Sequence, residues 1–120
     1  MVIAIDGPAG SGKSTIARKI ASDLGWYFLN TGSFYRAYTL AQLDKNLDPL
    51  DRDSVLETAK DTVITVENGN ICINGINAES RLHTPLVDKY ASPVSSDPRL
   101  REKVTDEVRK LAGNMNIVTE

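Results

Sequence analysis

Apolar and polar positions follow one another along the chain in patterns that predict short buried strands and amphipathic helices. Val2-Ile3-Ala4-Ile5 is an apolar, β-branched run, typical of a strand buried on both faces of a parallel sheet. Apolar residues then recur at helical spacing from Lys13 until Gly25, a residue suited to end a helix. The members of that stripe are Ile16, Ile20 and Leu24, with Ala17 and Ala21 beside them. Residues 26–29 predict a second strand.

Two further helices are expected after the second strand. Thr31 or Ser33 is placed to cap the first of them, and a short helix is predicted at about residues 54–60. The apolar positions of the first helix are Phe34, Ala37, Tyr38, Leu40 and Ala41.

A small antiparallel meander is predicted next. Residues 63–67 and 71–73 are rich in β-branched side chains, and each is followed by an Asn-Gly pair, Asn68-Gly69 and Asn74-Gly75. Asn-Gly is the strongest short signal for a two-residue hairpin turn, so we expect the strands to pair in succession.

The last part of the chain predicts two helices and a strand. Thr84-Pro85 and Asp97-Pro98 each place a capping side chain before a proline, the arrangement that begins a helix. The second helix is expected to end at Gly113, and residues 117–119 form a strand-like run. Its apolar stripe is Leu100, Val104, Val108 and Leu111. The order of elements predicts an α/β fold: an incomplete parallel sheet flanked by helices, carrying a small inserted antiparallel β and helix module.

Composition and charge exclude several classes of protein. With 14 basic and 16 acidic residues in 120, the net charge is −2, so we expect no nucleic-acid partner and no anionic membrane surface. No run approaches the roughly 20 apolar residues that span a bilayer. Cys72 is the single cysteine, which leaves no intramolecular disulfide and favours a reducing, cytoplasmic location.

The segment between the first strand and the first helix carries a phosphate-binding motif. It satisfies the pattern G-x-x-x-x-G-K-[ST] in the strand-and-helix context that the pattern requires. Its glycines let backbone N–H groups converge on an anion at a helix N-terminus, while Lys13 is suited to the outer phosphates and Ser14 to Mg²⁺. We therefore expect ATP or GTP with magnesium. The predicted nucleotide-binding residues are Gly7, Pro8, Ala9, Gly10, Ser11, Gly12, Lys13, Ser14 and Thr15.

A second candidate segment, residues 30–36, follows the second strand. In a doubly wound sheet it lies at a carboxyl end, on the same rim as the phosphate loop, so Arg36 is a candidate for a second phosphate. The alternative is an ordinary capped helix in which Tyr35 packs and Arg36 is solvated.

With these segments the chain resembles the bacterial cytidylate kinases, a family of nucleoside monophosphate kinases. The resemblance runs from Ile5 to Ser14, through Asn30-Thr31-Gly32-Ser33-Phe34-Tyr35-Arg36, and on to Ala91-Ser92-Pro93-Val94 and Pro98-Arg99-Leu100-Arg101. It implies that Thr31, Tyr35 and Arg36 hold a monophosphate. It also implies that Ser92 contacts cytosine and that Arg101 helps to discriminate it.

The resemblance also implies a division of the chain. Residues 1–60 would be the first part of the P-loop nucleotide-binding core, 61–97 a monophosphate-binding insertion, and 98–120 the return helix and strand of the core. Family members continue further, with a Gly-Arg-Asp segment, more strands and an arginine-bearing lid. We therefore expect this chain to be an incomplete form with weak or no activity alone, and its sheet edge after Val118 to be unpaired and prone to self-association.

Two positions depart from the family pattern. Asn30 stands where the family usually has Asp, which removes a carboxylate near the phosphates. His83 stands where an Arg is expected; it has no neighbouring Cys or second His, so capping or packing is favoured over a metal site.

The function implied is transfer of the γ-phosphoryl group of ATP to CMP or dCMP, with Mg²⁺, by a full-length monomer in which Lys13 and Arg36 are catalytic. Two alternatives stay open. The chain is another P-loop kinase, acting on AMP, UMP or a small metabolite, or it is a non-catalytic ATP-binding module.

Overall fold

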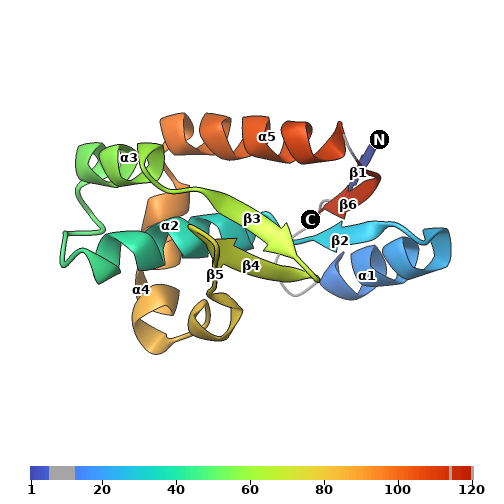
Figure 1. The fold of residues 1–120 in the computed structure, drawn as a ribbon, viewed down its shortest axis with the longest axis horizontal. Helices are drawn as coiled ribbons and strands as arrows, with labels where there is room; N and C mark the ends of the chain where they lie inside the picture. The colour runs from blue at the N-terminus through green and yellow to red at the C-terminus, as the bar shows by residue number, and fades with distance from the viewer. Residues whose placement is uncertain (6–12, 114, 120) are drawn as a thin grey trace. The chain divides into compact units, whose positions relative to one another are not determined.

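A computed structural model describes residues 1–5, 13–113 and 115–119, with Lys13, Ser14 and Ala112 described by backbone alone (Figure 1). The chain forms two compact units: residues 1–31 with 105–120, called the sheet unit here, and residues 32–104, called the helical unit. In chain order, the elements are β1 (Val2–Ala4), α1 (Lys13–Leu24), β2 (Tyr27–Leu29), α2 (Gly32–Asp44), α3 (Arg52–Lys60), β3 (Ile64–Glu67), β4 (Asn70–Ile73), β5 (Ile76–Asn77), η1 (Glu79–Arg81), α4 (Pro85–Ser95), α5 (Pro98–Ala112) and β6 (Ile117–Thr119).

The sheet unit is built on a parallel sheet with the strand order β1-β6-β2. Ile117 of β6 aligns with Val2 on one side and with Tyr27 on the other. The expectation of an unpaired edge after Val118 is therefore wrong, because β6 is the central strand. The residues of β6 are all buried, and a run that is apolar on both faces belongs in the middle of a parallel sheet.

Helix α1 packs on this sheet through its small residues. Ala17 and Ala21 are buried with Val118, whereas Ile16 and Leu24, predicted as part of the apolar stripe, are 52% and 49% exposed. Alanines let a helix approach a sheet closely, and Ile20, another member of the predicted stripe, packs against the same cluster. The predicted end of the helix is confirmed: Gly25 has a φ of 68°, and Trp26 N–H donates to the Ala21 carbonyl at 2.9 Å.

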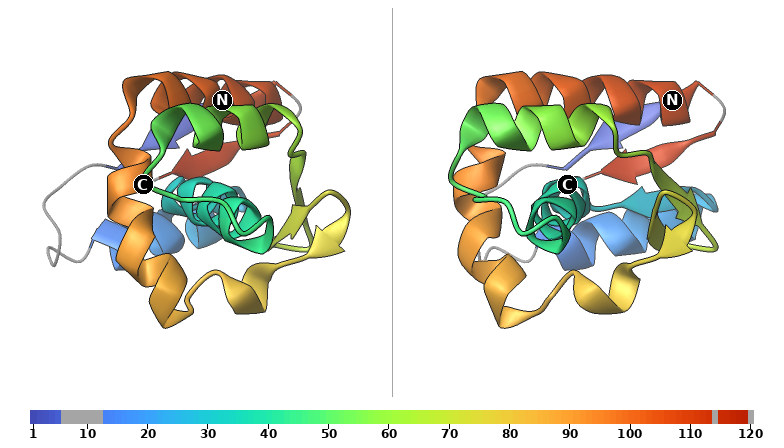
Figure 2. Two further views of the ribbon diagram at one scale, coloured as in Figure 1. Left: turned by 90° about the vertical axis from the view of Figure 1, so that its left-hand side faces the viewer. Right: turned by 60° about the vertical axis from the view of Figure 1, so that its left-hand side comes forward.

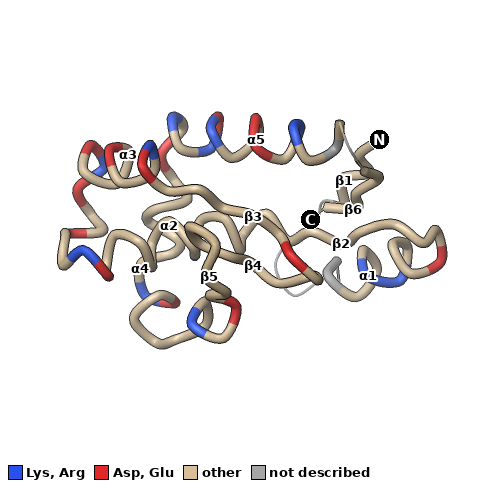
Figure 3. The backbone as a smooth tube through the Cα atoms, viewed as in Figure 1, with Lys and Arg blue, Asp and Glu red and all other residues tan. Residues whose placement is uncertain are grey.

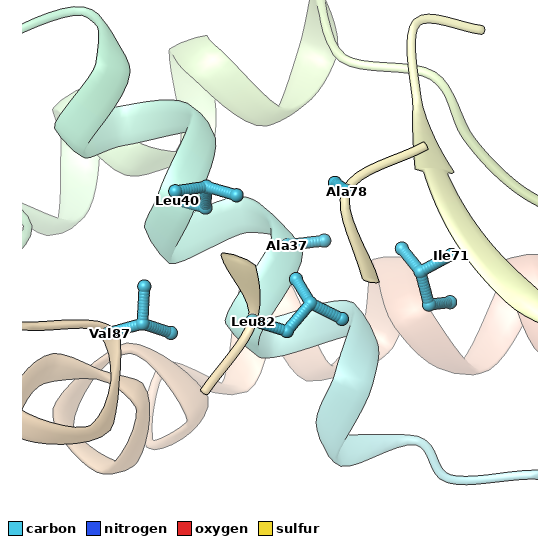
Figure 4. Packing of buried hydrophobic residues seen from close by; sticks show 6 residues of the cluster. All are labelled: Ala37, Leu40, Ile71, Ala78, Leu82 and Val87. Atoms are coloured by element: carbon cyan, nitrogen blue, oxygen red, sulfur yellow. The ribbon is translucent and has the colours of Figure 1, made fainter. Parts of the chain in front are cut away.

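The helical unit is organised around α2, which α3, α4 and the β3–β5 sheet surround (Figure 2). Its buried residues occupy nearly every side of the helix: Phe34, Tyr35, Ala37, Tyr38, Thr39, Leu40, Ala41 and Gln42. One cluster joins α2 to the later elements (Figure 4), through Ala37, Leu40, Ile71, Ala78, Leu82 and Val87. The segment from 71 to 87 is therefore part of the core that holds α2 in place.

The predicted meander is confirmed as an antiparallel sheet in the order β3-β4-β5. Its two turns have positive φ at both central residues, 53° and 78° at Asn68-Gly69 and 51° and 83° at Asn74-Gly75. That backbone is the one that two-residue hairpins of this type require. The lone cysteine, Cys72, is buried in β4.

Helix boundaries also follow the capping signals. Thr84 accepts a hydrogen bond from Val87 N–H at the start of α4, and Asp51 accepts one from Ser54 N–H at the start of α3. Helix α3 thus begins two residues before the predicted position.

The α/β class with a parallel sheet, flanking helices and an antiparallel insert is confirmed, whereas the three-segment division stays a prediction. In the described part of the chain, no helix combines the length and apolarity needed to cross a bilayer.

Candidate nucleotide-binding site

The phosphate-binding motif has the setting that its chemistry requires. Strand β1 ends at Ala4 and helix α1 begins at Lys13, so the motif connects the carboxyl end of a parallel strand to the N-terminus of a 12-residue helix. Such an N-terminus carries unpaired N–H groups and a partial positive charge, which favour anions. Thr15 lies in the first turn of α1 and is exposed. Gly7, Pro8, Ala9, Gly10, Ser11 and Gly12 lie outside the described residues, as do the side chains of Lys13 and Ser14.

The segment after β2 lies on the same edge of the sheet. Because β1, β6 and β2 are parallel, Asn30 and Thr31 follow the carboxyl end of β2 just as Ile5 follows that of β1. Ile5 N–H still donates to the Thr119 carbonyl at 2.8 Å, which continues the β1–β6 pairing to that edge. Thr31 therefore belongs to the rim at which ligands of open α/β sheets bind.

On the helical unit, Tyr35 and Arg101 face each other. Arg101 Cζ lies 5.8 Å from the centroid of the Tyr35 ring, within the range of a cation–π contact. Burial raises the pKa of the Tyr35 phenol, and the positive charge of Arg101 partly opposes that rise. Tyr35 is therefore a neutral hydroxyl at physiological pH, able both to donate and to accept a hydrogen bond.

Ser92 is linked to Arg101 through the last turn of α4. The Ser95 hydroxyl donates to the Ser92 carbonyl at 2.8 Å, and the Ser95 carbonyl accepts from Arg101 Nη1 at 3.1 Å. The side chain of Ser92 is exposed, so its hydroxyl is accessible to a ligand. The two residues predicted to read the base thus belong to one connected corner between α4 and α5.

Arg36 is held by groups that follow it by 46 and 52 residues in the sequence. Its Nη1 donates to the Leu82 carbonyl at 2.9 Å and to the carboxylate of Asp88. The Arg36 side chain is 26% exposed and that of Asp88 51% exposed. The alternative of an ordinary capped helix required a packed Tyr35 and a solvated Arg36. Tyr35 is packed, but Arg36 is paired and largely covered.

Sequence reasoning missed Asp88 and Ser95. Asp88 lies in the first turn of α4, where an acidic residue is usually explained by the helix dipole alone. Ser95 acts partly through its main-chain carbonyl, which carries no residue signature. The contact of Asp88 with Arg36 of α2 and that of Ser95 with Arg101 of α5 are seen only in the folded chain.

His83 is exposed, and the cap of α4 comes from its neighbour Thr84. The expected capping or packing role of His83 is therefore not observed, because the next residue caps the helix and His83 is exposed. Among the residues with described positions, no group of three His, Cys, Asp or Glu side chains is arranged to bind a metal.

Acidic and basic residues are interspersed along the chain rather than gathered in one stretch (Figure 3).

A cavity of about 230 Å³ lies elsewhere in the helical unit, between the loop before α3 and the end of α4. Pro49, Val55, Pro93 and Val94 provide its apolar lining. None of the predicted site residues lines it, so it is separate from the corner formed by Tyr35 and Arg101.

Comparison with known proteins places the whole described pattern in one family. Residues 3–120 match the sequence profile of the family described as cytidylate kinase. The chain is 36% identical over 118 residues to the cytidylate kinase of Caldanaerobacter subterraneus subsp. tengcongensis, covering 98% of this chain and 53% of that protein. It is 38% identical over 120 residues to that of Rhodopirellula baltica, covering 100% of this chain and 52% of that protein.

A cytidylate kinase of Clostridium botulinum is 36% identical over 118 residues, which cover 98% of this chain and 54% of that protein. The chain therefore spans about half the length of the curated relatives it matches. The match takes in the phosphate-binding motif, the segment around Arg36 and the corner around Arg101 together. The chain belongs to the cytidylate kinase family.

Proposed function

We propose that this chain forms the nucleotide-binding part of a phosphotransferase that moves the γ-phosphoryl group of ATP to CMP or dCMP. The observation that carries the proposal is the continuous family match over residues 3–120. A phosphate loop alone occurs in motors, switches and many kinases, so it does not choose a reaction. The match extends beyond that loop to residues 30–36 and to the corner around Arg101, for which the resemblance predicts acceptor-binding and base-reading roles.

On the donor side, the backbone N–H groups of Gly7 and of residues 9–12 would cradle the phosphates of ATP, and Lys13 would neutralise the outer ones. Thr15 would add a hydroxyl at the start of α1. The support from the structure is that β1 precedes this segment and α1 follows it.

Magnesium would be held by Ser14. Mg²⁺ is usually bound by few protein ligands, with water and substrate phosphates completing its octahedral shell. A single hydroxyl beside a phosphate loop fits this preference. When bound, the ion would neutralise charge on the phosphate oxygens.

On the acceptor side, Thr31, Tyr35 and Arg36 would hold the monophosphate, and Ser92 and Arg101 would contact the cytosine. Arginine suits the phosphate because its planar fork binds two oxygens at once and stays charged at any working pH. The neutral Tyr35 hydroxyl would donate to a phosphate oxygen without adding charge.

In the reaction, an oxygen of the CMP phosphate forms a bond to the γ-phosphorus while the bond from that phosphorus to the β–γ bridging oxygen breaks. The products are CDP and ADP. The acceptor is already an anion, so the chain's residues need only align the two nucleotides and neutralise the charge on the transferring oxygens. No general base is required.

The test is ADP release from Mg-ATP by this chain with CMP, dCMP, UMP or AMP supplied separately, together with calorimetric binding of each nucleotide. Selective binding of CMP and dCMP, with turnover confined to them, supports the proposal. Stimulation by AMP or UMP instead would make the chain another P-loop kinase. Binding of ATP with no acceptor binding would make it a non-catalytic module.

We also propose a reducing, cytoplasmic setting and a monomeric full-length protein. The support for the setting is the single cysteine, which is buried in β4. Sedimentation of the protein at several concentrations would test the monomeric state.

A further inference from the structure

The contacts of Arg36 fall on one side of its guanidinium group. Both the Leu82 carbonyl and the Asp88 carboxylate accept from Nη1. Within the described part of the chain, neither Nε nor Nη2 has a partner. The Nε–Nη2 edge of the fork is therefore left for a ligand, and that edge can bind two oxygens of one phosphate.

Asp88 is itself fixed in place by the start of α4. Thr84 caps the helix through Val87 N–H, and Asp88 N–H donates to the Thr84 carbonyl at 2.9 Å. Leu82, on the other side of the cap, has a fully buried side chain in the core cluster. The two acceptors of Nη1 therefore come from a rigid segment of the insertion, while Arg36 comes from α2.

We propose that Asp88 is a positioning residue that, with the Leu82 carbonyl, holds Arg36 so that its Nε–Nη2 edge faces the acceptor phosphate. This inference rests on the proposed function, in which Arg36 binds the monophosphate. A free arginine side chain loses much rotational freedom when it binds a ligand, and holding it beforehand lowers that cost. Asp88 also balances the charge of a guanidinium that is only 26% exposed.

A carboxylate near a phosphate site also repels the incoming anion, so the two effects of Asp88 oppose each other. Because Asp88 contacts Nη1 and the proposed phosphate edge is formed by Nε and Nη2, the positioning effect dominates. The measurable consequence is that removing Asp88 weakens CMP binding rather than strengthening it.

The chain offers a matched control. Arg81 binds Asp44 at the end of α2 through two hydrogen bonds, at 2.7 and 3.2 Å, so Asp44→Ala also removes an Asp–Arg pair from the helical unit. That pair does not involve Arg36. Any general effect of losing an acidic residue from this unit therefore appears in both variants.

The experiment is calorimetric titration of the unaltered chain and its variants with CMP and, separately, with Mg-ATP. Asp88→Ala is expected to weaken CMP binding by about 3- to 10-fold and to leave Mg-ATP binding unchanged, whereas Asp44→Ala changes neither. Asp88→Asn keeps an oxygen acceptor without the charge, so it should restore part of the CMP affinity. It also serves as the test if the alanine variant does not fold.

Asp88→Ala in an Arg36→Ala background separates the positioning of Arg36 by Asp88 from the repulsion between Asp88 and the phosphate of CMP. If Asp88 acts through Arg36, Asp88→Ala changes CMP affinity no further once Arg36 is gone. The ¹⁵N signal of Arg36 Nε, assigned by its loss in Arg36→Ala, should shift in Asp88→Ala and stay in place in Asp44→Ala.

The inference is overturned if Asp88→Ala binds CMP as well as or more tightly than the unaltered chain, or if it weakens binding equally in the Arg36→Ala background. An unmoved Arg36 Nε signal would overturn it as well. If the unaltered chain binds Mg-ATP but no CMP, the proposed function fails and this inference fails with it. Normal CMP binding by both the unaltered chain and Asp88→Ala leaves the proposed function standing and removes only the role of Asp88.

Discussion

The sheet unit and the helical unit carry their proposed phosphate-binding residues in two different ways. In the sheet unit, the proposed phosphate contacts belong to the motif between β1 and α1, whose residue types follow one another in the sequence. In the helical unit, they belong to side chains such as Arg36, whose partners follow it by 46 and 52 residues. A local motif can be found by reading along the chain, whereas a paired arginine is found only after the chain has folded.

The two units also differ in how they bury apolar surface. In the sheet unit, small residues of α1 cover β6, and the larger Ile16, Leu24 and Tyr27 are about half exposed. In the helical unit, large side chains of α2 such as Phe34 and Tyr38 are fully buried. The helical unit therefore holds its site residues by packing, and we expect its stability to depend strongly on single core residues.

The largest expected effect is on the loop of the sheet unit. Lys13→Met should lower phosphoryl transfer by at least about 10²-fold, because it removes one preorganised positive charge from the transferring phosphate. The measurement is ADP release with saturating Mg-ATP and CMP. Lys19→Met is the matched control, since Lys19 lies on the same helix, is exposed and pairs with Asp23 at 3.2 Å. Equal loss in both variants would contradict a specific role for the loop.

A core substitution should expose the contrast in packing. Leu82 is fully buried in the cluster that joins α2 to the insertion, so Leu82→Ala should cost about 2–5 kcal/mol of unfolding free energy. Ile16→Ala, on the half-exposed side of α1, should change it by less than about 0.5 kcal/mol. Urea unfolding of both variants measures the difference. Similar costs at the two sites would mean that Ile16 is covered in the folded protein.

The sequence was a good guide wherever the signal is local. The Asn-Gly turns, the Thr84 cap and the Gly25 helix end all depend on the backbone preferences of one or two residues, and all are present. The face of α1 was predicted only in part: Ala17, Ala21 and Ile20 pack on the sheet, but Ile16 and Leu24 do not. A helical stripe shows spacing but not which neighbour approaches. The small side chain of Ala17 allows that approach, which periodicity does not reveal.

Topology explains the other differences. The run at 117–119 was correctly predicted as a strand, but its central position depends on pairing with strands more than 80 residues earlier. The candidate site divides in the same way. Arg36 was proposed as a site residue from its place after β2. Asp88 was not, because an acidic residue in a first helical turn has an ordinary explanation.

A buried polar network offers a third, smaller test of the helical unit. Gln42 is fully buried; its Nε2 donates to Ser54 Oγ at 2.8 Å, and its Oε1 accepts from Thr58 Oγ1 at 2.6 Å. Gln42→Ala should cost about 1–3 kcal/mol, because it leaves the buried hydroxyl of Thr58 without that acceptor. Adding Thr58→Val in the same chain should recover part of the loss. Additive losses in urea unfolding would show that the two side chains act independently.

The smallest expected effect depends on pH and concerns Asp97, at the start of α5. Hydrogen bonds from Arg99, at 3.0 to 3.2 Å, hold the pKa of this carboxyl below its ordinary value of 3.8. Since the folded state favours the carboxylate, the stabilisation is complete above the unfolded pKa and is lost as the pH falls through the folded one.

Asp97→Asn should therefore have a lower urea midpoint than the unaltered chain at pH 7, and the gap should narrow as the pH falls below 3.8. Asp53→Asn is the control: Asp53 also binds Arg99, at 3.0 Å, but its side chain is 86% exposed, so its pair contributes little. A gap of constant size at every pH, including those at which Asp97 is protonated, would mean that the hydrogen bonds of Asp97 stabilise α5 and that its charge does not. A gap that closes identifies the charge of the Asp97 carboxylate as the stabilising feature.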